Sequence, residues 1–298
     1  MIRRLGRYVR GSWPPAFYLP YALLWALGLS ALFARADHRI GSWRPGPATV
    51  PAVAAFVLAL LLMRAVDDLR DLRYDRVHNP RRPLPSGAVA VADLGVLLGA
   101  GSAVALLLAL AVGPGAATVL AAVLLYAALL LALELLWRWP APQRVTLSAL
   151  LGLPVQLLLN CYLYAAVLAR AGLRPDGQLL APLLTAVAAF LHLEFARKTT
   201  RSPQPGEHSY STRYGAQGTA VRSVAAAGAA VLLALAVLRP WAGHGWGWLV
   251  LLPAGAVLFG ARRFWPGRAV RWPAGAAALF LLGDFAVFLL LGLLGKAA

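Results

Sequence analysis

Four aspartates in this sequence lie close enough together to do chemistry as a group: Asp67, Asp68, Asp71 and Asp75. The whole chain has only 11 acidic residues. In a continuous helix Asp67, Asp71 and Asp75 recur every four residues, which predicts that one face carries the set. Like charges at this spacing repel unless cations lie among them. Mg²⁺ suits such a group, because it prefers oxygen and is commonly shared between one or two carboxylates and substrate phosphates.

The residues around the aspartates are basic and proline-rich. Arg64 precedes the group by one turn and Arg82 follows it, and both are candidates to bind phosphate oxygens. Three prolines between positions 80 and 85 must end the helix there, because proline removes a backbone donor and fixes φ. The alternative is a solvated helix end on which Asp and Arg pair, as Arg64 and Asp68 would. Such surface pairs contribute less than about 1 kcal/mol each.

The elements that must position these side chains are membrane-spanning helices. Hydrophobic residues make up 60% of the chain and charged residues only 13%, against about 25% charged in soluble domains. Lipid leaves no partner for backbone polar groups, so segments this long must be helical. We therefore expect an all-α integral membrane protein with nine transmembrane helices, near residues 15–34, 47–66, 88–111, 115–138, 145–169, 178–197, 217–238, 245–261 and 272–295.

A membrane also explains the basic residues better than a nucleic acid does. The formal net charge is +17, but arginine and lysine gather at the ends of apolar stretches. We therefore expect no nucleic-acid partner. Most of the 28 basic residues fall at the N-terminus or in connections on the same side of the membrane as the N-terminus. This distribution predicts a cell-membrane protein with a cytoplasmic N-terminus and an external C-terminus. Residues 1–298 are interpreted as one polytopic domain, and residues 1–14 as a basic amphipathic lead-in.

The aspartate run and the segment after it resemble a known family. Asp67-Asp68-x-x-Asp71-x-x-x-Asp75, followed by Arg82-Pro-Leu-Pro-Ser-Gly, is similar to the first motif of the UbiA-type intramembrane prenyltransferases. The resemblance implies a fold of spanning helices with motif loops on the cytoplasmic side. It also implies that all four aspartates hold Mg²⁺ on the diphosphate of an allylic isoprenyl donor, and that Asp68, Asp71 and Asp75 are catalytic.

The second motif of that family departs from the pattern. Family members usually carry Asp-x-x-x-Asp at the end of the sixth helix, whereas this chain has Glu194 and Lys198 at those positions. Glu194 can serve as the first acid and metal ligand. Lys198, with Arg197, would then bind the diphosphate directly in place of a second metal. The alternative is that Glu194 and Lys198 form only an i,i+4 ion pair.

The expected function is transfer of an isoprenyl group to a lipophilic, aromatic or similarly nucleophilic acceptor. Within the same superfamily the alternative is a terpene cyclase, and outside it a lipid-binding or transport protein without catalysis. The residues do not fix chain length, acceptor or oligomeric state. Asn160, Tyr162 and Tyr164 are predicted to line the substrate cavity, and a further set of aromatic side chains is available for cation–π contact with an allylic cation: Tyr126, Phe190 and Phe195.

Overall fold

The computed structural model describes residues 1–139, 145–204, 209–242 and 245–295, and within these ranges every long element is a helix. Within the described residues, nine helical segments are long and apolar enough to cross a membrane. The principal α-helices are α1 (Ile2–Ser12), α2 (Pro15–Ala36), α3 (Val50–Arg70), α4 (Leu72–His78), α5 (Val91–Val112), α6 (Pro114–Trp137), α7 (Val145–Ala171), α8 (Leu180–Arg197), α9 (Ser211–Leu238), α10 (Ala254–Phe264) and α11 (Ala274–Leu294).

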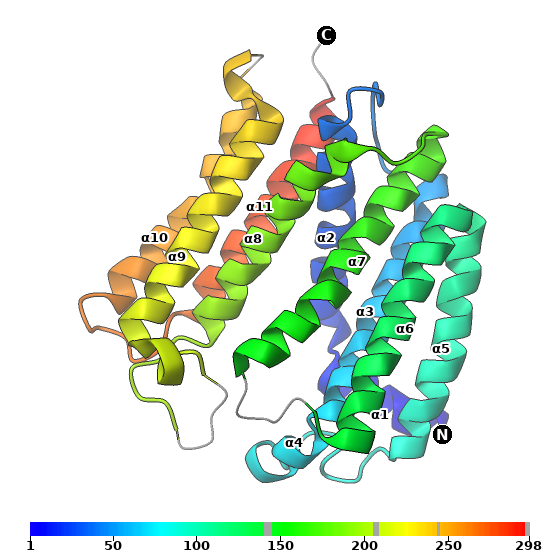
Figure 1. The fold of residues 1–298 in the computed structure, drawn as a ribbon, viewed down its shortest axis with the longest axis vertical. Helices are drawn as coiled ribbons and strands as arrows, with labels where there is room; N and C mark the ends of the chain where they lie inside the picture. Colours follow the sequence, from blue (N-terminus) through cyan, green and yellow to red (C-terminus); the bar gives the residue numbers. More distant parts are fainter. Residues whose placement is uncertain (140–144, 205–208, 243–244, 296–298) are drawn as a thin grey trace.

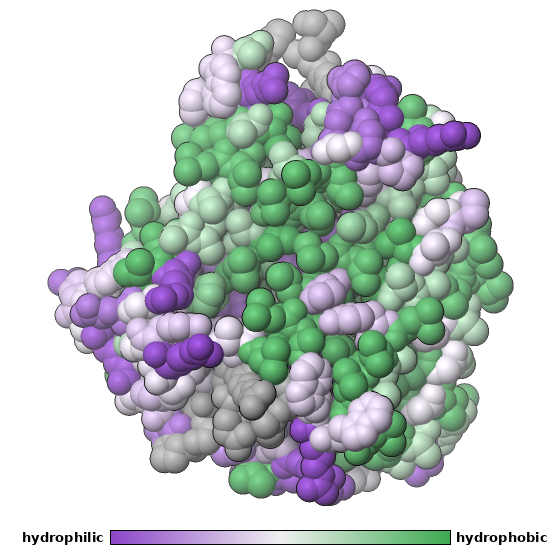
Figure 2. Space-filling view, in the orientation of Figure 1, coloured by the Kyte–Doolittle hydropathy of each residue, from purple (hydrophilic) through white to green (hydrophobic). Residues whose placement is uncertain are grey.

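The surface of the bundle matches a lipid environment. Figure 2 shows a broad hydrophobic band across the middle of the molecule, with hydrophilic residues gathered at its two ends. Large apolar side chains such as Leu107, Leu125 and Leu232 are more than half exposed, which suits lipid and not water. The expected all-α membrane fold is confirmed, and the protein is a multi-pass membrane protein.

The described helices form a ring that closes between α2 and α11. α11 packs along α2, α3 packs on α5, and α8 packs on α9 (Figure 1). Gly28 in α2 permits this closure, because a Cβ atom there would collide with the backbone oxygen of Phe285 in α11. Small residues at helix contacts allow close backbone approach in membranes.

Two spans differ from their predicted limits for local reasons. α9 begins at Ser211, six residues before the predicted start, but Gly215 has φ of 71° and breaks the helix inside that extension. The eighth span divides into the 3₁₀ segment η4 (Trp246–Leu251) and α10. Pro253, the N-cap of α10, lies between the two; proline has no backbone N–H to continue a helix.

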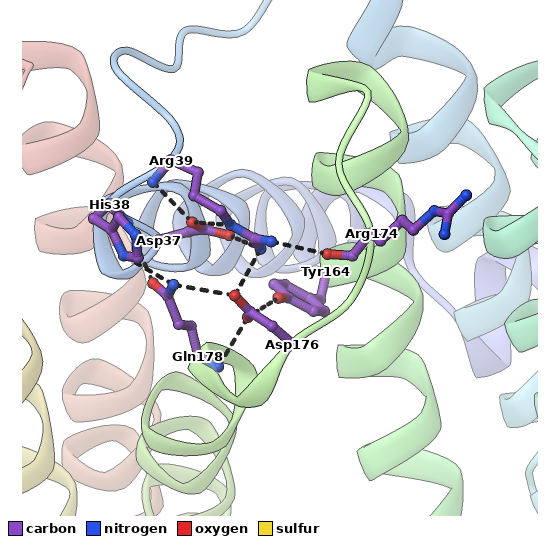
Figure 3. A network of polar contacts seen from close by, with 7 residues as sticks. All are labelled: Asp37, His38, Arg39, Tyr164, Arg174, Asp176 and Gln178. Carbon is purple, nitrogen blue, oxygen red and sulfur yellow. Dashed lines mark hydrogen bonds and ion pairs between the residues drawn. The ribbon is translucent and has the colours of Figure 1, made fainter.

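The two ends of the bundle carry different polar structures. α1 and α4 lie at one end, which we call the motif end (Figure 1). At the opposite end a polar network joins the segment after α2 to the connection between α7 and α8 (Figure 3). There Arg39 is 2.6 Å from Asp37 and 3.0 Å from Asp176. Tyr164 donates a hydrogen bond of 3.1 Å to Asp176.

Candidate active site

A cavity of about 750 Å³ runs into the bundle from the motif end. Its lining comes from α2, α3, α4, α6, α7, α8 and α9, so helices far apart in the sequence must assemble to form it. Charged side chains lie among its lining residues, at the ends of α3, α6 and α8 and at the start of α4. Apolar and aromatic side chains supply much of the rest, including Trp25, Met63, Leu159 and Phe190.

Two of the four aspartates line this cavity. Asp67 lies in the last turn of α3 and its side chain is 59% exposed. Asp71 follows the end of α3, one helical turn further on, and also lines the cavity. The backbone N–H of Asp71 still donates to the carbonyl of Asp67, at 2.8 Å, so this turn is held. Arg70 lies between them, with its guanidinium 3.9 Å from Asp67.

The other two aspartates are buried and paired, and neither lines the cavity. Asp68 lies 2.7 Å from the guanidinium of Arg64 and accepts a hydrogen bond of 2.9 Å from Tyr8 in α1. Asp75 lies 2.6 Å from Arg82 and accepts a 2.7 Å hydrogen bond from Asn79. Neighbouring residues in a helix point about 100° apart, so the motif divides between two faces instead of sharing one as expected.

The proline-rich segment explains why Asp68 and Asp75 are enclosed. The chain after α4 folds back and brings Arg82 to both carboxylates, at 2.6 Å from Asp75 and 4.0 Å from Asp68. Leu84 and Val89 in the same segment are buried against Tyr8 and Leu94. Arg64 and Arg82, which we predicted to bind diphosphate, instead pair with the two buried aspartates of the motif. Neither arginine lines the cavity. The predicted metal-binding roles of Asp68 and Asp75 stay predictions.

Across the cavity, the end of α8 provides a mixed acid and base cluster. Glu194 lies 2.6 Å from Lys198 and 2.9 Å from Arg197, and all three line the cavity. Tyr210 donates a 3.3 Å hydrogen bond to Glu194, and the Lys198 ammonium lies 5.1 Å from the centre of the Tyr210 ring. Burial and the nearby Glu194 carboxylate raise the pKa of Tyr210, so its hydroxyl remains a donor. The sequence-predicted second motif therefore faces Asp67 and Asp71 across one space.

The three residues predicted to line the substrate cavity lie elsewhere. Asn160 is fully buried behind the cavity wall, where its Oδ1 accepts a 3.0 Å hydrogen bond from the indole of Trp25. Tyr162 donates to the carbonyl of Ala52 in α3, at 3.0 Å. Tyr164 belongs to the network at the opposite end (Figure 3). None of the three lines the cavity; Asn160 is connected to it through the hydrogen bond from Trp25, which does line it.

Several lining residues escaped the sequence reasoning. Tyr21 and Trp25 project from one face of α2, and Trp25 packs on Phe190 of α8 with ring centres 4.4 Å apart. Their i,i+4 spacing was the available signal. Arg222 in α9 also lines the cavity and lies over the ring of Tyr214, with 4.2 Å from guanidinium to ring centre.

The cavity suits a divalent cation shared with a phosphorylated ligand. Within the described residues no group of three or more Asp, Glu, His or Cys side chains is placed to hold a metal by itself. Asp67 and Asp71 nevertheless present carboxylate oxygens one helical turn apart, and Glu194 lies on the opposite wall. Mg²⁺ commonly uses one or two carboxylates and completes its coordination with water and substrate phosphate. The donor set fits that mode of binding.

Comparisons by sequence and by structure give different answers. No protein-family model matches the sequence, and no curated protein matches it. Solved structures match it over most of its length. The apo structure of a UbiA homologue from Aeropyrum pernix K1 aligns with a TM-score of 0.65 and 20% identity, covering 91% of this chain and 96% of the homologue.

Two further solved structures agree with the first. A UbiA homologue from Archaeoglobus fulgidus bound to DMAPP and Mg²⁺ aligns with a TM-score of 0.59 and 17% identity, covering 96% of this chain and all of the other. A structure of digeranylgeranylglyceryl phosphate synthase aligns with a TM-score of 0.56 and 12% identity over 97% of this chain. At such identities the likeness establishes the fold. The fold that the first motif implied is confirmed.

Proposed function

We propose that this chain, which has the fold of the UbiA homologues, is an Mg²⁺-dependent membrane prenyltransferase. Its donor would be an isoprenyl diphosphate, and its acceptor a lipophilic molecule with an aromatic or similarly nucleophilic group. Structures with the same fold hold DMAPP or GPP together with Mg²⁺. The whole chain would act as one membrane domain.

One observation carries the proposal: a single cavity joins a charged end to an apolar interior. Carboxylates and cations from α3 and α8 lie at the charged end, where a diphosphate and its metal would bind. Aromatic and aliphatic side chains line the interior, where an isoprenyl chain would be sheltered from water. A molecule with a polar diphosphate and an apolar tail matches both parts at once.

At the charged end, Asp67, Asp71 and Glu194 would hold Mg²⁺. Bound there, Mg²⁺ would neutralise the diphosphate as the C–O bond to the isoprenyl group breaks. Lys198 and Arg197 would contact the diphosphate oxygens directly, and Arg70 would do so beside Asp67. Groups that are already in place stabilise charge that develops in the transition state without reorganising.

In the interior, aromatic faces would stabilise the allylic carbocation until the acceptor attacks it. Trp25 and Phe190 line the cavity in contact with each other, and indole is the strongest aromatic partner for a cation. Asn160 holds the Trp25 indole through its hydrogen bond. Exclusion of water would prevent hydrolysis of the cation.

For the topology we propose that the motif end faces the cytoplasm, with the N-terminus inside and the C-terminus outside. Basic residues concentrate in the connections at this end, and such residues are retained on the cytoplasmic side during insertion. Reporter fusions after α2 and after α11 test the orientation. If a reporter that works only in the cytoplasm is active when fused after α11, the proposed orientation is wrong.

Incubation of the purified protein with Mg²⁺ and farnesyl or geranylgeranyl diphosphate tests the function against its alternatives. Pyrophosphate release that requires an added aromatic acceptor supports transfer. Release without an acceptor, accompanied by a cyclic product, supports a terpene cyclase. Tight binding of the diphosphate without any release indicates a lipid-binding or transport protein and overturns the enzymatic proposal.

A further inference from the structure

α1 is joined to the aspartate motif by one buried hydrogen bond. Tyr8 is completely buried, and its hydroxyl donates to Oδ2 of Asp68 at 2.9 Å over a separation of 60 residues. Burial, reinforced by the Asp68 carboxylate, raises the pKa of Tyr8, so the hydroxyl keeps its proton and remains the donor. Asp68 directly follows Asp67 in the last turn of α3. The position of α1 therefore bears on how that turn presents Asp67 to the cavity.

The inner side of α1 is fitted to the protein at further points. Arg4 lies 3.0 Å from Asp93 in the first turn of α5. Gly11 leaves room for Pro83 of the proline-rich segment, because a Cβ atom at position 11 would overlap that ring. These contacts hold the side of α1 that carries Tyr8 against the rest of the protein.

The other side of α1 carries three arginines that internal packing does not explain. Arg3, Arg7 and Arg10 follow the i, i+4, i+7 spacing of one helix face, turned away from Tyr8. All three are exposed. In the part of the chain that the structure describes, no hydrogen bond or ion pair engages their side chains. Like charges one turn apart repel each other, so this face favours an anionic partner.

The location of α1 identifies that partner as the bilayer. α1 lies at the motif end of a bundle whose hydrophobic band marks the membrane (Figures 1 and 2). A basic amphipathic helix in this position lies beside the lipid headgroups. Each arginine near an anionic membrane surface increases the equilibrium constant for binding to that surface by about fivefold. Anionic phospholipid headgroups therefore complement the row in both charge and place.

We propose that Arg3, Arg7 and Arg10 form a binding surface for anionic phospholipid, and that lipid bound there holds Tyr8 on Asp68 and so positions the metal-binding turn of α3. Tyr8 is then a positioning residue that acts through Asp68. The effect on turnover rests on the proposed function. The effect of lipid on α1 and on the end of α3 does not.

Hydrogen exchange on the full chain in nanodiscs tests the physical part. In discs that contain phosphatidylglycerol, amides of residues 2–12 and 64–70 should exchange several-fold more slowly than in discs of phosphatidylcholine alone. Replacing Arg3, Arg7 and Arg10 by Gln should remove the difference. The matched control replaces Arg262, Arg263 and Arg268 by Gln, which removes three exposed arginines at or after the end of α10, and should preserve it. Equal exchange in the two lipids overturns the proposal.

Tyr8→Phe tests the link to the metal site, because it removes the hydroxyl and keeps the ring. This variant should retain lipid-dependent exchange in residues 2–12 and lose it in residues 64–70. In the prenyl-transfer assay it should need about tenfold more Mg²⁺ for half-maximal rate, as loss of an outer support of a metal site typically does. A variant with unchanged exchange at the end of α3 contradicts the coupling. If no preparation turns over, the exchange results still decide the proposal and the failure falls on the proposed function alone.

Discussion

The two ends of this bundle use the same kinds of side chain for different purposes. At the opposite end, Asp37 and Asp176 share the guanidinium of Arg39, and Tyr164 completes the pairing of Asp176. The protein itself supplies the partners of these carboxylates. At the motif end Asp68 and Asp75 are enclosed in this way, while Asp67 and Asp71 line a cavity. A ligand in the cavity can reach a carboxylate that lines it.

The largest difference between the two ends should appear in the turnover rate when one cavity carboxylate is removed. Asp71→Asn keeps the size of the side chain and removes its charge, so the site should hold Mg²⁺ and diphosphate poorly. We expect the turnover rate to fall by at least about 100-fold, measured as pyrophosphate release. Asp176→Asn is the control at the opposite end and should remain within about twofold of the wild-type rate. Full activity of the Asp71 variant would show that this face is not the metal site.

A smaller change is expected from reversing one charge across the cavity. Lys198→Asp removes the partner of Glu194 and adds a carboxylate, so the diphosphate loses a direct cationic contact and a metal gains a ligand. The Mg²⁺ dependence should become steeper, and KM for the diphosphate should rise about tenfold. Lys198→Gln separates these effects, because it should raise KM without changing the steepness. An unchanged Mg²⁺ titration together with an unchanged KM in Lys198→Asp would exclude a role for Lys198.

The ion pair of Asp75 and Arg82 at the motif end should contribute to the free energy of unfolding. The Asp75 side chain is 2% exposed and that of Arg82 is 39% exposed. Arg82→Gln leaves a buried carboxylate without its ion partner and should lower the free energy of unfolding by about 3–5 kcal/mol. Asp75→Ala frees an arginine that can reach water and should cost about 1–3 kcal/mol. Denaturation in detergent measures both, and the reverse order would contradict the role of Arg82 as the main partner of Asp75.

The network at the opposite end should produce the smallest effect, through pH. The Arg39 guanidinium, hydrogen-bonded to Asp37, lowers the pKa of that carboxyl. Because the folded-state pKa is below the ordinary value of about 3.9, the stabilisation is present above that pH and is lost as pH falls through the lowered pKa. Asp37→Asn should therefore flatten the acid side of the plot of thermal stability against pH. Identical profiles would show that the pair contributes nothing.

Hydropathy and motif spacing predicted much of the fold, because the cost of exposing backbone to lipid leaves few alternatives. The spans and the basic lead-in that became α1 follow from local pattern. That Asp67, Asp71 and Glu194 line one cavity does not follow from local pattern, and only the resemblance of the two motifs to a known family implied a shared site. The enclosure of Asp68 and Asp75 within the protein does not follow from local pattern either. It depends on Tyr8 and Arg82, which reach Asp68 and Asp75 only after the chain has folded back.

The cavity wall was harder to predict for a similar reason. Asn160, Tyr162 and Tyr164 lie at every second position of α7, yet each contacts a different helix or connection: α2, α3 and the network at the opposite end. Polarity in a spanning helix indicates that a side chain needs a partner. It does not indicate whether that partner is protein or substrate, and this depends on packing between helices.

The closure of the ring at Gly28 has a consequence for how the protein is made. α2 leaves the ribosome well before α11, the helix against which Gly28 packs. At typical synthesis rates of roughly 5–20 residues per second, α2 waits on the order of 10–50 seconds for this neighbour. During that interval the nascent bundle must remain open along one seam in the bilayer. Retention of the unfinished chain by the insertion machinery would protect that seam.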